Sequence, residues 1–271
     1  MKREVLVRYL DAWTPVVLRS PRPATYVESG GSAFAADALR VFSEFADRLD
    51  GHHLDMVIIG PPTPLGEPPA GLSVRFADLP PHAVAGPLLA HIDLVEDSAL
   101  TEPDAMRWAA SLGKAHEVLL TLPTAADHRA RVAELGLPCT VAVELVADDG
   151  TAQLLVFATG DSRHLTTFKN ELWAADEFAG IRYRDPNDAE RHLIDISLTP
   201  QLPPLRTALL AELARRGSCT VAELREHTLL ATIYRPADAI GALTSAAATG
   251  AIAREPAKGR LTPRTRVSHR D

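Results

Sequence analysis

The sequence predicts an α/β protein in which strands alternate with helices, followed by a smaller, mainly helical C-terminal module. Three observations predict this class. Short apolar or β-branched runs alternate with helical patterns over most of the 271 residues. Asp149-Gly150 joins two strand-like runs, which is typical of a β-hairpin. The Pro-rich stretch from Thr199 to Pro204 marks a change of character, so we expect domains at residues 1–199 and 200–271.

Composition limits the class of protein further. With 46% hydrophobic residues the chain can bury a substantial core. The cysteines, Cys139 and Cys219, lie in no Cys-x-x-Cys context, and this favours a reducing cytoplasm. No apolar run is long enough to span a bilayer, so we expect no membrane association. The ten histidines lack ligand spacing, and no metal site is expected.

The net charge of −7 conceals two parts of opposite sign. From residue 200 onward there are eleven Lys/Arg against six Asp/Glu, which gives +5, and the rest of the chain has 17 against 29, which gives −12. A basic module on an acidic body is expected of a nucleic-acid-binding appendage. Two domains that dock on each other by charge would show the same division.

The N-terminal part predicts a helix and then a strand–turn–helix unit. Residues 2–17 have the period of an amphipathic helix, and Thr25 to Glu28 read as a buried strand. Ser29-Gly30-Gly31 is a tight turn, since glycine adopts positive φ without steric cost. Ser32 is a plausible N-cap for a helix to Leu49. On the first helix the expected buried side is Val5, Leu6, Tyr9, Leu10, Trp13, Val16 and Val17.

The rest of the larger domain continues the alternation. Strands are expected at 54–59, 72–76, 88–94 and 117–122, and helices from a Thr101 cap to Leu112, at 127–135 and at 164–178. The hairpin strands are expected at 140–146 and 151–158, and Asp161 or Ser162 is the expected N-cap of the helix that follows them. This order predicts a Rossmann-like sheet that ends in an antiparallel pair.

Three short helices and a hairpin are expected after residue 200. The first helix is expected over 205–215, the second after a Thr220–Glu223 capping box, and the third from Pro236 to Ala248. Extended pieces at 251–254 and 260–262 form the hairpin. This pattern predicts a winged helix-turn-helix module.

Ligand-site candidates lie at the ends of two strands. Ser29, Gly30 and Gly31 precede a helix N-terminus, the place where doubly wound proteins meet a nucleotide-like ligand, although a plain structural turn fits the same residues because no G-x-G-x-x-G is present. Glu28 and Asp93 end their strands. Each is either a ligand-facing carboxylate or an ordinary solvated one.

The nucleic-acid candidates lie outside the predicted third helix. That helix contains no Lys or Arg and cannot make bidentate guanine contacts, so it could dock a protein instead. Cations of the hairpin and tail could contact phosphates without reading sequence, or form a solvated tail. They are Arg254, Lys258, Arg260, Arg264, Arg266 and Arg270.

Several segments, in the same order along the chain, resemble the three-Cys-motif partner (TcmP) family of methyltransferase-like proteins. KREVLVRYLDAWTPVV at 2–17 resembles the opening helix of the family, with its Tyr-Leu and Trp-x-Pro. TYVESGGSAFAADAL at 25–39 is similar to a shortened form of its strand and glycine turn. AQLLVFATGDSRHLTTFKNELW at 152–173 resembles its late strand and helix, and the C-terminal module resembles its winged helix.

The resemblance implies a class I S-adenosylmethionine-dependent methyltransferase fold and a three-Cys-motif iron–sulfur-type partner protein. It implies cofactor contacts by Glu28, Ser29, Gly30 and Gly31 and a substrate-orienting role for Asp93. The sequence departs from the family in four places, the first being Glu28, which stands where the family has Asp and preserves a carboxylate. The Phe-Ala-Gly-Pro-Gly loop is contracted to Ser29-Gly30-Gly31, strand 54–59 ends in Gly60-Pro61-Pro62 without an acid for the ribose, and only Asp93 remains of an Asp-Pro-Phe-Gly motif.

Two functions therefore remain open at the level of the sequence. The first is a methyltransferase, or a relative that has lost activity, acting on nucleic acid or on something bound to it. The second is a non-catalytic adaptor that docks a partner protein and contacts nucleic acid through its basic C-terminal hairpin. Glu28 and Asp93 favour the first, whereas the short turn and the missing ribose acid favour the second.

Overall fold

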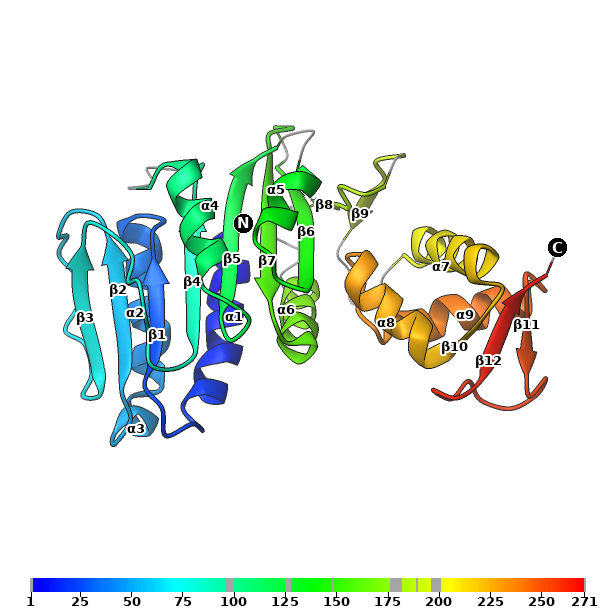
Figure 1. Ribbon diagram of the computed structural model, residues 1–271, viewed down its shortest axis with the longest axis horizontal. Coiled ribbons are helices and arrows are strands. Elements are labelled where there is room, and N and C mark those ends of the chain that lie inside the picture. The colour runs from blue at the N-terminus through cyan, green and yellow to red at the C-terminus, as the bar shows by residue number, and fades with distance from the viewer. Residues whose placement is uncertain are drawn as a thin grey trace.

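In the part of the chain that the computed structural model describes, the strands form a nine-stranded mixed sheet and, in the C-terminal part, a three-stranded sheet (Figure 1). The structure describes residues 2–95, 100–124, 128–147, 149–175, 182–188, 190–195 and 201–270. The strand order of the large sheet is β3-β2-β1-β4-β5-β7-β6-β8-β9. Its strands are β1 (Ala24–Glu28), β2 (Leu54–Ile59), β3 (Leu72–Ala77), β4 (Leu88–Asp93), β5 (Glu117–Pro123), β6 (Cys139–Val146), β7 (Ala152–Thr159), β8 (Arg182–Arg184) and β9 (Leu193–Asp195).

The first five strands are parallel, and β7 inserts antiparallel between β5 and β6. The register places Val27 between Val57 of β2 and Ala90 of β4. This order agrees with the doubly wound arrangement up to β5. The predicted α/β class, its Rossmann-like sheet and its antiparallel finishing pair are confirmed.

Neighbouring residues of a strand point to opposite faces of the sheet, so the buried strands present an apolar surface on each face. Helices cover both of these faces. Tyr26 belongs to the core under α1, α2 and α6, whereas Val27 belongs to the core under α4 and α5. Phe157 and Phe168 stack within the first core, with ring centroids 4.4 Å apart. The helices of this part are α1 (Lys2–Val17), α2 (Ser32–Glu44), α3 (Ala46–Leu49), α4 (Glu102–Ser111), α5 (His128–Glu134) and α6 (Ser162–Ala174).

Several predicted boundaries of the larger part are corrected. The helix expected from Ser32 to Leu49 is broken at Phe45 into α2 and α3, and its N-cap is Gly31 without a side-chain bond. Val16 is exposed (44%) because it lies on the outer side of α1. The helix expected over 164–178 begins at Ser162, two residues earlier, because Asp161 caps it by accepting from the Arg163 N–H. Thr101 is the N-cap of α4, as predicted.

Some predictions fall outside the described residues. Asp127, the expected start of a helix, and Phe178, the expected end of another, are among them, as is Asp148 of the predicted hairpin turn. Strands β8 and β9, which extend the sheet beyond β6, were not predicted.

The C-terminal part contains α7 (Pro203–Arg216), β10 (Ser218–Thr220), α8 (Val221–Ala231), α9 (Asp238–Ala248), β11 (Ile252–Glu255) and β12 (Arg266–His269). The capping box of Thr220 and Glu223 is present at α8, as predicted. The second hairpin strand is β12, not 260–262, because Val267 pairs with both Cys219 of β10 and Arg254 of β11. Strand β10 was not predicted.

The C-terminal part packs against the sheet on the side of α6 (Figure 1). The core under α1, α2 and α6 continues into apolar residues of α7, α8 and α9, including Leu205, Leu229 and Ala242. Tyr234 donates to the carbonyl of Gln201 at 2.8 Å. Within the described residues, no helix is long and apolar enough to cross a membrane.

Candidate functional site

The carboxyl ends of β1 and β4 form the point where the strand order reverses. β1 pairs with β2 on one side and with β4 on the other, so the connections that follow β1 and β4 leave toward opposite faces. Ligands of open α/β sheets bind in the crevice at such a point. The predicted residues Glu28, Ser29, Gly30 and Asp93 meet here.

Glu28 is fully buried and its carboxylate is bound within the protein. Oε1 accepts from the Gly30 N–H at 2.6 Å and contacts His91 Nδ1 at 2.8 Å, and Oε2 accepts from the Tyr26 hydroxyl. Burial, together with the Glu28 charge, raises the pKa of Tyr26 well above its ordinary value. Glu28 therefore holds the main chain at Gly30, where the glycine turn begins, by a hydrogen bond from within the core.

The turn itself is packed on one side and open on the other. A Cβ at Gly30 would lie 2.9 Å from Glu28 Oε1 and 3.1 Å from Asp93 Cβ, so a larger residue would displace the Glu28 side chain. Gly31 has φ +91°, and no atom lies within 4 Å of where its Cβ would be. Among the described residues, no group hydrogen-bonds the buried Ser29 Oγ. The turn therefore has open space beside Gly31 and, next to it, a buried Ser29 hydroxyl without a hydrogen-bond partner among the described residues.

Asp93 forms a buried ion pair with a residue that sequence reasoning missed. Lys2 Nζ, from the first turn of α1, lies 2.5 Å from Asp93 Oδ2, and both side chains are nearly inaccessible. Asp93 Oδ1 accepts from the Val95 N–H at 2.9 Å. The Lys2 ammonium also lies 5.7 Å from the Phe34 ring centroid. This lysine occupies the end of β4, the position expected to face a substrate.

The end of β2 carries no acidic side chain, as the sequence indicates. β2 ends at Ile59, and the following Gly60 donates its N–H to the carbonyl of Ala77. Pro61 and Pro62 then carry the chain away. Residues 59–62, which end this strand and follow it, therefore offer no carboxylate to ribose hydroxyls.

A second buried carboxylate lies at the opposite, amino end of β5. Glu117 accepts from the Tyr9 hydroxyl, from Trp13 Nε1 at 3.1 Å and from His164 Nδ1 at 3.0 Å. The hydrogen bond to Glu117 raises the pKa of His164. These bonds connect α1, β5 and α6, so this cluster fixes α1 on the sheet, away from the glycine turn.

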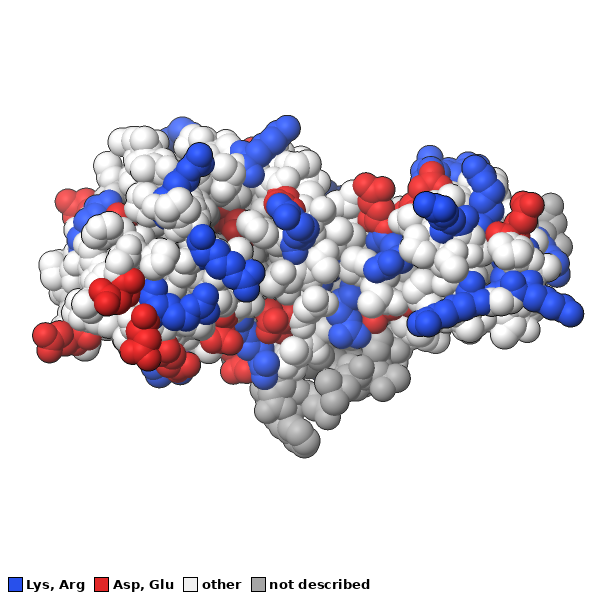
Figure 2. All heavy atoms as spheres, turned by 90° about the horizontal axis from the view of Figure 1, so that it is seen from below, with Lys and Arg blue, Asp and Glu red and all other residues white. Residues whose placement is uncertain are grey.

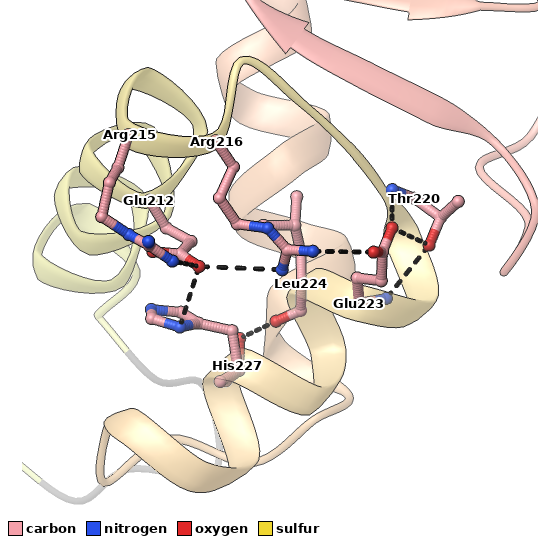
Figure 3. Close-up of polar contacts among 8 residues, drawn as sticks. Glu212, Arg215, Arg216, Thr220, Glu223, Leu224 and His227 are labelled. Carbon is pink, nitrogen blue, oxygen red and sulfur yellow. Dashed lines mark hydrogen bonds and ion pairs between the residues drawn. The ribbon is translucent and has the colours of Figure 1, made fainter.

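Cations of the C-terminal part divide into two groups. Arg215 donates to Glu212 at 2.8 and 2.9 Å, and Arg216 lies 2.8 Å from Glu223 (Figure 3). The hydrogen bonds from Arg215 lower the pKa of Glu212. His227 Nδ1 is 3.7 Å from the same carboxylate. These arginines are neutralised where α7 meets α8.

The β11–β12 hairpin and its connection carry the second group. Of the residues the structure describes, no acidic side chain forms an ion pair with these cations, although Arg254 donates to the carbonyl of Ala257 at 3.0 Å. Figure 2 shows Lys and Arg side chains gathered at this end of the molecule. Arg254 is half-buried. The other cations of this group are exposed: Lys258, Arg260, Arg264, Arg266 and Arg270.

Cavities of about 360 to 520 Å³ lie along the junction of the sheet with the C-terminal part. The exposed Leu230, at the end of α8, borders two of them. One of these two cavities is lined in part by Arg129, Leu137 and Val141, and the other by Pro138, Cys139 and Arg225. Within the described residues, no three His, Cys, Asp or Glu side chains group as a metal site would require.

Comparison with known proteins gives structural likeness only. No family model matches the chain, and no curated protein matches it. It is similar to the methyltransferase domain of bacterial CtHen1 (10% identity, TM-score 0.32, covering 57% of this chain and 99% of that one). It is similar to the precorrin-6y C5,15-methyltransferase of Geobacter metallireducens (10%, 0.29, 55% and 87%). It is also similar to the N-terminal domain of human METTL16 in complex with SAH (8%, 0.31, 58% and 68%).

Proposed function

We propose that this chain is a class I methyltransferase-like protein of the three-Cys-motif partner type that binds S-adenosylmethionine weakly over Ser29, Gly30 and Gly31. The observation that carries the proposal is the glycine turn at the point where the strand order reverses, with open space beside Gly31 and an unused Ser29 hydroxyl. The cofactor, when bound, supplies an electrophilic methyl group. Ser29, the Gly30 carbonyl and the backbone of Gly31 would hold its methionine end, since the Gly30 N–H is already donated to Glu28 Oε1.

Weak binding follows from the contacts that the site lacks. Glu28 is already bound to Tyr26, Gly30 and His91, and the end of β2 has no acid for the ribose. Each lost hydrogen bond or charged contact costs about 1 to 3 kcal/mol. Two lost contacts therefore lower the affinity on the order of a hundredfold.

Calorimetric titration of the full chain with S-adenosylmethionine and its demethylated product tests this proposal. We expect saturable binding with a dissociation constant on the order of 100 µM or higher, reduced further in Ser29→Ala. Ser73→Ala, on the exposed edge strand β3, is the matched control and leaves binding unchanged. Low-micromolar binding would contradict the lost-contact argument and favour an active enzyme.

The Lys2–Asp93 ion pair favours a second candidate, a non-catalytic adaptor. The pair fills the strand end that a substrate would use, and the cavities near Leu230 offer a surface to a partner protein. A three-Cys-motif iron–sulfur-type protein is the partner that the resemblance implies. If neither the wild type nor Lys2→Met binds S-adenosylmethionine in the titration, the result supports this candidate over the first.

For residues 200–271 we propose a winged helix-turn-helix domain that contacts nucleic acid. The order α7, β10, α8, α9, β11, β12 with a three-stranded sheet supports this description. The proposed contacts are phosphates, made by cations of the β11–β12 hairpin that have no acidic partner among the described residues. The salt dependence of binding to duplexes of unrelated sequence tests it.

A further inference from the structure

One lysine of the sheet part ends inside the C-terminal part. Lys169 lies on α6, and its side chain is fully buried. Its ammonium lies within hydrogen-bonding distance of four main-chain carbonyl oxygens, which share its three N–H donors: those of Thr228 at 3.1 Å, Leu229 at 2.6 Å, Thr232 at 2.5 Å and Tyr234 at 3.0 Å. Four neutral acceptors therefore surround one cation.

The end of α8 explains why these carbonyls converge. The last carbonyls of a helix have no partner within the helix, and a glycine after the last turn often supplies one. α8 has no such glycine, and its C-cap Thr232 is extended. The Thr232 hydroxyl donates to the Thr228 carbonyl and accepts from the Tyr234 N–H, which folds the chain back over the helix end. The carbonyls thus face inward, at the negative end of the helix dipole.

Contacts beside the ammonium join the same two segments. Trp173, one turn after Lys169, donates Nε1 to the carbonyl of Ile233 at 3.0 Å. The Trp173 ring lies 5.4 Å from that of Tyr234 and 5.5 Å from the Arg235 guanidinium. Two side chains of α6, Lys169 and Trp173, therefore contact the turn between α8 and α9.

We infer that the main-chain carbonyls of Thr228, Leu229, Thr232 and Tyr234 form a primary-ammonium site, filled by Lys169 of the same chain, and that its occupancy holds the C-terminal part on α6. The chemistry is specific because an ammonium has three N–H donors in a compact head. A guanidinium is planar and larger than an ammonium, and a quaternary ammonium has no N–H donor.

The electrostatic surroundings are balanced. Burial lowers the pKa of Lys169 to about 7, whereas the charges of Asp185 and Asp238 raise it. Lys169 is in turn one of the groups that lower the pKa of Asp185, although burial raises it overall. The carbonyl oxygens and the α8 dipole favour the charged amine. Burial and these acceptors therefore act on the Lys169 pKa in opposite directions, and burial has the larger effect.

Amine footprinting of the unmodified full-length protein gives the first test. The chain has four lysines, at positions 2, 114, 169 and 258, and Lys114 and Lys258 are exposed. Under brief reductive methylation read by mass spectrometry, we expect Lys169 to react at least tenfold more slowly than these two. Equal reaction at Lys169 and Lys258 would overturn the inference.

Chemical rescue gives the second test. Lys169→Ala removes three methylenes and the amine, and n-propylammonium replaces these atoms. We expect the variant to melt at a lower temperature than the wild type and to regain stability saturably with n-propylammonium but not with tetramethylammonium. Lys114→Ala, at an exposed lysine, should show neither effect.

Each outcome of the rescue experiment either supports the ammonium site or argues against it. Folding of the variant only with n-propylammonium supports the site. A variant that melts like the wild type, or that both cations stabilise equally, overturns it. If the variant folds in neither, the footprint of the unmodified protein decides.

Discussion

Charged residues in two regions of this molecule occupy contrasting environments. At the carboxyl ends of β1 and β4, Glu28 and Asp93 are inaccessible and bound to neighbours of the same chain. On the β11–β12 hairpin, Arg260, Arg264 and Arg266 are exposed, and no described acidic residue pairs with them. The difference teaches that the first set contributes mainly to the fold, whereas the second set is available to an outside ligand.

The largest expected effect concerns the buried ion pair. Asp93→Ala leaves the Lys2 ammonium buried beside an apolar methyl, and breaking a buried pair costs about 3 to 5 kcal/mol. Urea unfolding measures the loss. Asp78→Ala, at an exposed aspartate after β3, is the control and should change stability by less than about 0.5 kcal/mol. Equal, small effects in both variants would erase the contrast between the two regions.

The reverse pattern is expected at the β11–β12 hairpin. Replacing Arg260, Arg264 and Arg266 together by alanine should change stability little, because surface substitutions each contribute within about 0.5 kcal/mol. Affinity for duplex DNA should fall for all sequences alike, and the logarithmic salt slope should flatten by about 3, since each phosphate contact contributes about −0.9.

Fluorescence anisotropy over a salt series checks the hairpin prediction. Arg40→Ala, where the arginine pairs with Glu44 on α2, is the matched control and should bind like the wild type. A triple variant that kept its affinity, or lost it for one sequence only, would move the contact surface elsewhere. It would leave the hairpin as an ordinary solvated end.

Asp161, the N-cap of α6, stands between the two extremes because it is partly exposed. Hydrogen bonds from Arg163 lower its pKa to about 2. A lowered carboxyl pKa means that its stabilisation is present above about pH 4 and is lost as the pH falls through about 2. Asp161→Ala should cost about 1 kcal/mol at pH 7.

Chemical denaturation from pH 7 to pH 2 tests the Asp161 prediction. The free-energy difference between wild type and Asp161→Ala should shrink toward zero at the acid end. With Asp78→Ala the difference should stay near zero throughout. A constant difference across the whole range would show that the carboxylate charge is not what stabilises the helix start.

The sequence predicted what local patterns determine. The β1–β5 and β6–β7 strands and the caps at Thr101, Asp161 and Thr220 follow from alternation and capping chemistry. The strand at 266–269 was misplaced at 260–262 because β12 is defined by pairing with both β11 and β10, and β10 lies more than 40 residues earlier in the sequence. Long-range pairing leaves only a weak local signal.

The candidate site was predicted in part. Glu28, Ser29, Gly30 and Asp93 do come together, but their bonds to Lys2 and His91 were missed. A signal existed for the lysines. Lys2 lies in line with Val5, Leu6 and Tyr9 on α1, and Lys169 with Leu165 and Leu172 on α6. A lysine within the apolar stripe of a helix needs buried partners, and that spacing could have identified both.

The Glu117 cluster has a consequence for the order in which the protein is made. Tyr9 leaves the ribosome long before Glu117, which lies 108 positions later. At about 5 to 20 residues per second, α1 waits on the order of 5 to 20 seconds before its carboxylate acceptor is synthesised. His164 follows later still. The hydrogen bonds that join α1 to β5 and α6 can therefore form only after residues 117 and 164 have been synthesised.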